Sequence, residues 1–255
     1  MIIFGDSRRM KEVPDSSIHL IVTSPPYFNA PFDYPDMFKD YDAFLNMITD
    51  VSKEMFRVLA RGRVVCLVTQ DVRIKGKLYP ITSDILRIMM SSGFAYRDRI
   101  IWRKPDGYVR ISRRSGVLIQ HPYPMYYYPD NVFEEILILQ KGRYKRERSD
   151  TQIDIERFNR EKWYLNVWDI TNVLPSRNDG VAAFPEEIPY RLITLFSHVG
   201  ETVLDPFAGS GTTLKVAKEL GRKAIGYEID TRLIDVIRKK VNVEMIVRED
   251  AKKVS

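Results

Sequence analysis

Residues 23–27 read Thr-Ser-Pro-Pro-Tyr and place two hydrogen-bond acceptors next to an aromatic ring. The hydroxyl of Ser24 and the carbonyl of Pro25 can each accept a hydrogen bond. Pro25 and Pro26 stiffen the backbone and lack amide hydrogens, so the acceptors keep a fixed orientation. Tyr27 adds a flat face on which a base can stack. This arrangement suits the exocyclic amine of a nucleobase, which has two hydrogens to donate. A strand that simply ends at a proline, with a hydroxyl cap, is the structural alternative.

A second motif, Asp-Pro-Phe-Ala-Gly-Ser-Gly-Thr-Thr, occupies residues 205–213, between a predicted strand and a predicted helix. Its glycines allow a ligand to approach the backbone closely, and the start of the helix offers free amide hydrogens to an anionic group. Glu228 follows at the end of the next strand, where a doubly wound fold places the acid that holds ribose hydroxyls. The motif therefore predicts a site for an adenosine-containing ligand, formed by Asp205, Phe207, Ala208, Gly209, Ser210, Gly211, Thr212 and Glu228. No Lys-Ser/Thr pair follows the glycines, which excludes a Walker A loop.

Hydrophobic periodicity predicts the elements that must position these motifs. Apolar residues three or four apart indicate a helix over residues 41–59, with Gly62 as its stop. Short apolar runs and turn residues predict strands over 18–23, 63–69, 96–102, 135–139, 202–205 and 224–229, and helices over 81–90 and 212–220. Strands and helices alternate, which favours an α/β fold with parallel strands and helices on both faces.

Two segments interrupt this alternation and are rich in positive charge, at residues 104–120 and 141–170. Basic side chains in such segments can contact the phosphates of a nucleic acid, although charge runs are also common on solvated surfaces. The predicted phosphate contacts are Arg110, Arg113, Arg114, Lys141, Arg143, Lys145, Arg146 and Arg148.

The composition limits the class of protein. The chain has 255 residues, 44% of them hydrophobic, and 40 Lys and Arg against 34 Asp and Glu, which favours one compact body with a polyanionic partner. The single cysteine, Cys66, excludes a disulfide framework and fits a reducing compartment. No apolar run is long enough to span a bilayer and the start lacks a signal sequence, so we expect a soluble, cytoplasmic protein without a membrane partner. His19, His121 and His198 lack metal-ligand spacing, and we predict no metal.

Taken together, TSPPY, DPFAGSGTT and the acid in IGYEID resemble the S-adenosylmethionine-dependent DNA amino-methyltransferases. TSPPY comes first, a basic region second and DPFAGSG third, as in the circularly permuted beta class of that family. Residues 4–6 resemble the family's acidic turn near the cofactor adenine. Residues 54–62 resemble the junction between a helix and a strand in the core, and residues 184–193 resemble the helix before the cofactor strand. The resemblance therefore adds Asp6 and Phe184 to the expected cofactor contacts.

The fold implied by this resemblance is a doubly wound, mostly parallel sheet of the Rossmann-like methyltransferase type, circularly permuted, with a small inserted DNA-recognition lobe. Residues 1–140 would form the catalytic half of the core, including the basic insertion near 104–120. Residues 141–180 would be the target-recognition segment, and residues 181–255 the cofactor-binding half.

The activity implied is transfer of a methyl group from S-adenosylmethionine, leaving S-adenosylhomocysteine, to the N4 amine of a flipped-out cytosine in double-stranded DNA. In the family, Ser at the position of Ser24 usually accompanies cytosine N4, whereas Asp accompanies adenine N6. Adenine N6 methylation, RNA methylation and a non-catalytic nucleic-acid-binding module remain alternatives. Methylation at ring carbon C5 needs a cysteine nucleophile. Cys66 lies in the apolar run RVVCLVT, a predicted buried strand, so we do not expect C5 methylation. A cognate restriction endonuclease is a further expected partner, and the sequence does not predict the oligomeric state.

Overall fold

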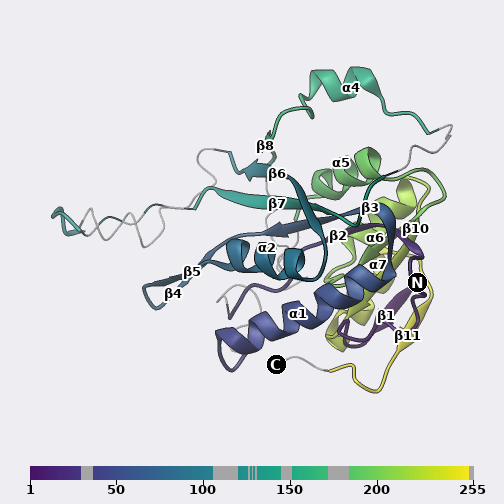
Figure 1. Ribbon diagram of the computed structural model, residues 1–255, viewed down its shortest axis with the longest axis horizontal. Coiled ribbons are helices and arrows are strands. Elements are labelled where there is room, and N and C mark those ends of the chain that lie inside the picture. Colours follow the sequence, from purple (N-terminus) through teal and green to yellow (C-terminus); the bar gives the residue numbers. More distant parts are fainter. Residues whose placement is uncertain are drawn as a thin grey trace.

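The computed structural model describes residues 1–29, 37–105, 120–125, 127, 129, 131–144, 151–171 and 184–252. Within these residues, nine strands form one sheet in the order β11-β1-β10-β9-β2-β3-β7-β6-β8 (Figure 1). The strands are β1 (Ile2–Phe4), β2 (Ile18–Thr23), β3 (Leu59–Thr69), β6 (Ala95–Arg103), β7 (Phe133–Gln140), β8 (Val167–Asp169), β9 (Thr202–Asp205), β10 (Lys223–Glu228) and β11 (Met245–Val247).

The strands from β11 to β3 in this order are parallel to one another. β7 runs antiparallel to its neighbours β3 and β6, and β8 pairs in parallel with β6 at the edge. The prediction of a mostly parallel sheet is therefore confirmed. Since β8 belongs to residues 141–180, part of the predicted recognition segment contributes to the sheet itself.

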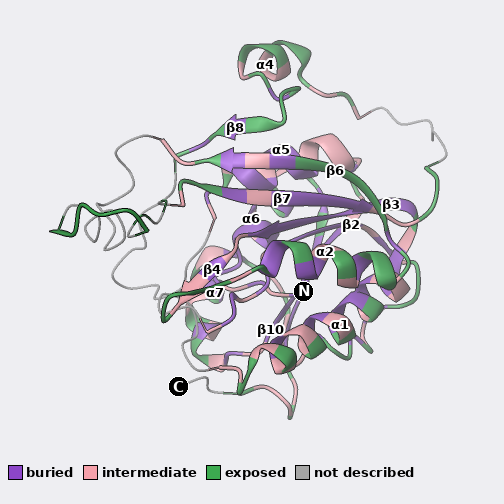
Figure 2. Cartoon of the chain, turned by 60° about the vertical axis from the view of Figure 1, so that its left-hand side comes forward, coloured by how far each residue is buried: buried purple, intermediate pink, exposed green. Residues whose placement is uncertain are grey.

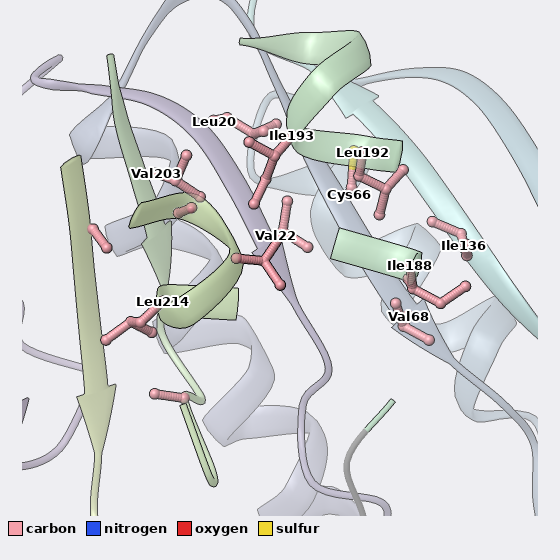
Figure 3. Close-up of a cluster of buried hydrophobic side chains, with 14 of the residues drawn as sticks. Leu20, Val22, Cys66, Val68, Ile136, Ile188, Leu192, Ile193, Val203 and Leu214 are labelled. Atoms are coloured by element: carbon pink, nitrogen blue, oxygen red, sulfur yellow. The ribbon is translucent and has the colours of Figure 1, made fainter. Parts of the chain in front are cut away.

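Helices cover both faces of the sheet, because side chains alternate along each buried strand. On one face, α1 (Tyr41–Val58) and α2 (Ile81–Ser91) pack against residues such as Ile21 and Leu67. On the other face, α5 (Glu187–Phe196), α6 (Thr212–Glu219) and α7 (Ile234–Lys240) pack against Val22 and its neighbours. Figure 2 shows the buried strands between these layers, and Figure 3 shows α5 facing the sheet.

Helix α1 begins where its sequence predicts. Asp40 caps the helix by accepting a hydrogen bond from the amide of Ala43 at 2.8 Å. The helix ends at Val58, so the prediction that Gly62 stops it is wrong. Gly62 instead lies inside β3 with φ +85°, near the shift in register between β2 and β3, and its amide donates to the carbonyl of Lys141. Glycine tolerates this backbone conformation, which other residues rarely adopt.

Three smaller features complete the described part of the chain. The hairpin of β4 (Val72–Ile74) and β5 (Lys77–Tyr79) projects from the body after β3 (Figure 1). Helix α4 (Ile155–Arg160) stands beyond β8 and has no buried residues, and the 3-10 turn η1 (Thr231–Leu233) precedes α7. No helix in the described ranges is long and apolar enough to cross a bilayer.

Candidate active site

The two predicted motifs follow neighbouring strands, β2 and β9, which are parallel and pair through Leu20 and Ile21. From β9 the chain passes through α6 to β10 on one side, whereas from β2 it passes through α1 to β3 on the other side. The connections therefore diverge between these two strands. In open α/β sheets, ligands bind outside the carboxyl ends of the strands at such a switch point. The fold thus brings both motifs to the position where a ligand is expected.

A buried hydrogen bond joins the two motifs directly. The hydroxyl of Thr23 donates to Oδ1 of Asp205 at 2.6 Å, and the amide of Phe207 donates to the same oxygen at 3.0 Å. Asp205 is only 2% exposed. Burial raises the pKa of Asp205 to about 6, although the hydrogen bond from Thr23 acts in the opposite direction. Asp205 therefore fixes the end of β9 against the end of β2.

Ser24 is the next residue after this contact and is partly exposed. No residue in the described part of the chain forms a hydrogen bond with its hydroxyl. Pro25 and Pro26 then turn the chain away from the sheet without offering amide hydrogens. The Ser24 hydroxyl consequently lies beside the switch point, and its role as an acceptor for an amine remains a prediction.

Tyr27 is fixed by a buried ion pair that the sequence analysis missed. Its hydroxyl donates to Oε2 of Glu134 at 2.8 Å, and Nζ of Lys104 contacts the other carboxylate oxygen of Glu134 at 2.9 Å. Tyr27 and Glu134 are 6% and 7% exposed. The ring therefore has a defined orientation, and a base can stack on it only if the side chains that cover it move. The stacking role remains a prediction.

The glycine turn after β9 encloses a buried carboxylate. Gly209 and Gly211 have φ values of 51° and 82°, in the left-handed region that glycine adopts readily. The amide of Gly209 donates to Oε2 of Glu228 at 2.8 Å, and the amide of Asp230 donates to Oε1 at 2.9 Å. Glu228 is 6% exposed, and burial raises its pKa to about 7. These contacts place the predicted acid at the glycine turn.

The donor set at this end of the sheet fits an adenosine-containing cofactor. The carboxylate of Glu228 can accept hydrogen bonds from ribose hydroxyls, and the first turn of α6 has amides without a side-chain cap. Asp6 follows the adjacent strand β1, where the amide of Gly5 donates to the carbonyl of Glu228 at 2.8 Å. Asp6 itself accepts a hydrogen bond from the amide of Arg8 at 2.9 Å.

Some of the predicted cofactor contacts have other partners. The hydroxyls of Ser210 and Thr212 accept hydrogen bonds from Nζ of Lys240 at 3.1 and 2.7 Å. Lys240, at the end of α7, was missed because nothing in the sequence connects it with a turn 28 residues earlier. Ala208 is buried and Phe207 partly buried, and Phe184 packs against the core beside α5. Ser210 and Thr212 therefore hold the glycine turn to α7.

Two predicted phosphate contacts lie far from this site. Nζ of Lys141 donates to the carbonyls of Phe56 and Leu59 at 2.6 and 2.7 Å, at the end of α1. This position, like that of Arg143, is at the amino end of β3, opposite the carboxyl ends that form the site. Lys141 therefore stabilises the end of a helix. The other six predicted phosphate contacts, Arg110, Arg113, Arg114, Lys145, Arg146 and Arg148, lie outside the described residues.

Cys66 lies in β3 and is fully buried, with its sulfur against α5 near Leu192 (Figure 3). Burial raises the pKa of its thiol well above the usual range, so the reactive thiolate is disfavoured. Among the residues with described positions, no group of three His, Cys, Asp or Glu side chains could hold a metal ion. Cys66 is therefore a core residue and a poor candidate for a nucleophile.

A glycine turn with a buried acid, placed beside a proline-stiffened turn at a switch point, is typical of α/β proteins that bind an adenosine-containing ligand. The model of the N6/N4 DNA methylase family matches residues 18–239. The chain therefore belongs to this family of S-adenosylmethionine-dependent DNA amino-methyltransferases.

Individual relatives agree with this assignment. The chain is 33% identical to the Type II methyltransferase M.MjaI of Methanocaldococcus jannaschii over 95% of this chain and 91% of that protein. It is 28% identical to the DNA adenine methyltransferase YhdJ of Escherichia coli K12 over 95% of this chain and 82% of that protein. TTHA0409 of Thermus thermophilus, solved in complex with S-adenosyl-L-methionine, superposes with a TM-score of 0.75 and 30% identity, covering 97% of this chain and 99% of that one.

Proposed function

We propose that this protein methylates the N4 amine of cytosine in double-stranded DNA, with S-adenosylmethionine as the methyl donor. The observation that supports this most directly is the position of Ser24. Its partly exposed hydroxyl has no hydrogen-bond partner among the described residues and lies next to Thr23, which is bonded to Asp205 of the cofactor motif. An acceptor for the amine is thus joined to the turn expected to hold the donor.

The amine of cytosine is a weak nucleophile because its lone pair is delocalised into the ring. The Ser24 hydroxyl and the Pro25 carbonyl would accept one hydrogen bond each from its two hydrogens. This holds the nitrogen in a pyramidal form and concentrates its lone pair on one side. The protein's contribution is then alignment and charge placement, without a covalent intermediate on the enzyme.

The cofactor would be held by Glu228 through its ribose hydroxyls and by the glycine turn through backbone amides. When bound, S-adenosylmethionine supplies a methyl group made electrophilic by the sulfonium. Asp6 and Phe184 remain proposed contacts, as implied by the family resemblance. Asp205 would support the cofactor site indirectly, because its carboxylate already accepts hydrogen bonds from Thr23 and Phe207.

The target base must leave the duplex to reach Ser24, because the stack hides its amine. Tyr27 would then stack on the extruded base after its covering side chains move aside. One base on one aromatic ring contributes about 1–3 kcal/mol. Because methyltransferases of Methanocaldococcus jannaschii and Escherichia coli are among its relatives, we place the enzyme in the cytoplasm of a prokaryotic cell. Similarity to a Type II methyltransferase favours a role in restriction–modification, with a cognate endonuclease as a further partner.

Adenine N6 methylation is the second candidate, and the likeness to the DNA adenine methyltransferase YhdJ favours it. Either base presents an NH2 group that two acceptors can hold. The test is to methylate duplex DNA, digest it enzymatically and identify the modified nucleoside by mass. N4-methylcytosine supports the proposal, and N6-methyladenine alone would replace cytosine with adenine. Cofactor binding without incorporation into any DNA would instead indicate a non-catalytic binding module.

A further inference from the structure

The hairpin formed by β4 and β5 is a feature of the site edge that the activity described so far does not use. We propose that this hairpin, residues 72–79, binds the phosphate backbone of the DNA duplex next to the extruded base. The inference rests on the proposed DNA substrate and adds a contact surface to it. It is distinct from the basic segments at 104–120 and 141–170.

The hairpin emerges from the correct edge of the sheet. It follows the carboxyl end of β3, which pairs with β2 up to Thr23, the residue before Ser24. Figure 1 shows the hairpin projecting away from the body of the molecule. Its strands have three residues each, so the tip extends roughly 10 Å beyond its root. A duplex whose base enters at Ser24 must pass close to this edge.

The tip of the hairpin is a tight and ordered turn. Lys75 and Gly76 have φ values of 48° and 85°, as a two-residue turn between antiparallel strands requires. A guanidinium nitrogen of Arg73 donates to the carbonyl of Gly76 at 2.7 Å and closes the turn. The two lysines that flank the glycine are exposed. Both exposed side chains thus extend from a defined backbone.

The two lysines of this tip are not neutralised by a carboxylate of the described residues. Residues 72–79 contain Arg73, Lys75 and Lys77 but no acid. Lys75 forms no ion pair within the described ranges. The ammonium nitrogen of Lys77 lies 4.8 Å from the centroid of the Tyr79 ring. Other basic side chains at the carboxyl edge do have carboxylate partners: Arg8 with Asp6, Arg103 with Asp169, and Lys104 with Glu134. Two such lysines on a projection beside a DNA site suit phosphate binding.

The root of the hairpin is packed onto the catalytic turn. The ring of Tyr79 lies 4.8 Å from that of Phe28 and 4.9 Å from that of Tyr41, measured between centroids. Phe28 directly follows Tyr27, the last residue of the TSPPY motif. A phosphate bound at the tip is therefore held at a fixed position relative to Ser24. This geometry favours a duplex over a lipid surface, because the duplex must also reach that turn.

The test compares two double variants that remove the same charge. Lys75→Ala/Lys77→Ala alters the hairpin, and Arg61→Ala/Lys223→Ala removes two exposed basic side chains at the opposite, amino end of the sheet. Binding to a short duplex of unrelated sequence is measured over a range of salt concentrations, together with S-adenosylmethionine binding to confirm folding. Binding of the same proteins to single-stranded RNA and to anionic vesicles is measured in parallel.

We expect the hairpin variant to bind duplex DNA on the order of tenfold more weakly at low salt, with the slope of log affinity against log salt reduced by about 2. The control variant should keep the slope of the unaltered protein. Equal slopes in the two variants would overturn the inference, and so would a hairpin-dependent loss seen only with RNA or vesicles. If the unaltered protein neither binds nor methylates duplex DNA, the proposed function fails and the inference fails with it. Methylation by the unaltered protein with no effect of the hairpin variant would remove the inference alone.

Discussion

Glu228 is a buried acid whose charge state depends on what it binds. Without a ligand, burial raises its pKa to about 7 from an ordinary 4.5, even though two backbone amides donate to it. The folded protein therefore retains a proton that the unfolded chain releases between about pH 4.5 and 7. The contribution of this group to stability consequently falls as the pH rises through that window.

Cofactor binding should show the opposite dependence on pH. Ribose hydroxyls that donate to Glu228 favour its ionised form, so binding releases the proton. We expect affinity for S-adenosylmethionine to increase from about pH 5.5 to about pH 8, with an inflection near the pKa of about 7. Titration calorimetry in buffers of different ionisation enthalpy measures both the affinity and the proton release.

The matched control is Glu228→Gln, which keeps the side-chain size and removes the titrating group. Its affinity should be lower at pH 8 and should lack that inflection. An unaltered dissociation constant in this variant would contradict the assignment of Glu228 to the ribose.

Cys66 provides a second test at the scale of a single residue. Because the thiol is buried in the core and its pKa is raised, we expect Cys66→Ala to transfer methyl groups at a rate within about twofold of the unaltered protein. The variant should lose about 1 kcal/mol of stability through lost packing. Single-turnover methylation assays and denaturant unfolding measure the two effects. A folded variant without transfer activity would indicate a thiol nucleophile and refute amine methylation.

At the scale of elements, a side-chain hydrogen bond from Thr23 to Asp205 joins the ends of β2 and β9, in addition to the backbone pairing of the two strands. Thr23→Val keeps the side-chain shape but leaves the buried carboxylate without this donor. We expect a loss of about 1–3 kcal/mol in the free energy of unfolding. Thr23→Ser restores the hydroxyl and should recover most of that loss. Equal stability of the Val and Ser variants would show that the hydrogen bond does not hold the two strand ends together.

Elements with a repeated apolar spacing, or with turn residues at both ends, could be predicted from the sequence. Helix α1 shows its apolar spacing over five turns, and β2 and β9 are apolar runs bounded by turn residues. β1, β8 and β11 have three residues each, too few for any periodicity, and were missed. Gly62 was misread because glycine ends helices and also permits irregular strands.

Site residues in contiguous motifs could be predicted, whereas their distant partners could not. Ser24 and Gly209 belong to contiguous motifs, so local sequence identifies them. Glu134 lies 107 residues from Tyr27, and only the pairing of β3 with β7 brings the two together. Lys141 is the converse case, because the basic run predicts phosphate binding whereas the fold directs its ammonium to the carbonyls at the end of α1. Long-range partners of this kind follow from topology and cannot be derived from spacing.

At the scale of the whole molecule, the two ends of the chain build the same part of the sheet. β1 lies between β10 and β11, and the amino terminus donates to the carbonyl of Ala224 at 2.8 Å. The two halves proposed from the sequence, residues 1–140 and 181–255, therefore share one sheet. We expect a single cooperative unfolding transition in calorimetry, shifted to higher temperature by S-adenosylmethionine.

At a cofactor concentration of 100 times Kd, the stabilisation should be about 2.7 kcal/mol. Because we expect a single transition, the calorimetric and van't Hoff enthalpies should agree. Two separate transitions, of which only one responds to the cofactor, would show that the halves fold independently and would contradict the continuous sheet.

The most direct test of the account is single-turnover methyl transfer by Ser24→Ala at saturating cofactor and duplex DNA. In the proposed mechanism the Ser24 hydroxyl accepts a hydrogen bond from the reacting amine and does not contact S-adenosylmethionine. We therefore predict a transfer rate lower by about 10- to 100-fold, as for loss of one hydrogen bond that orients the reacting group, and a nearly unchanged Kd for S-adenosylmethionine. An undiminished transfer rate, or a loss that arises from failure to bind the cofactor, would contradict the proposal that this turn holds the nitrogen for attack.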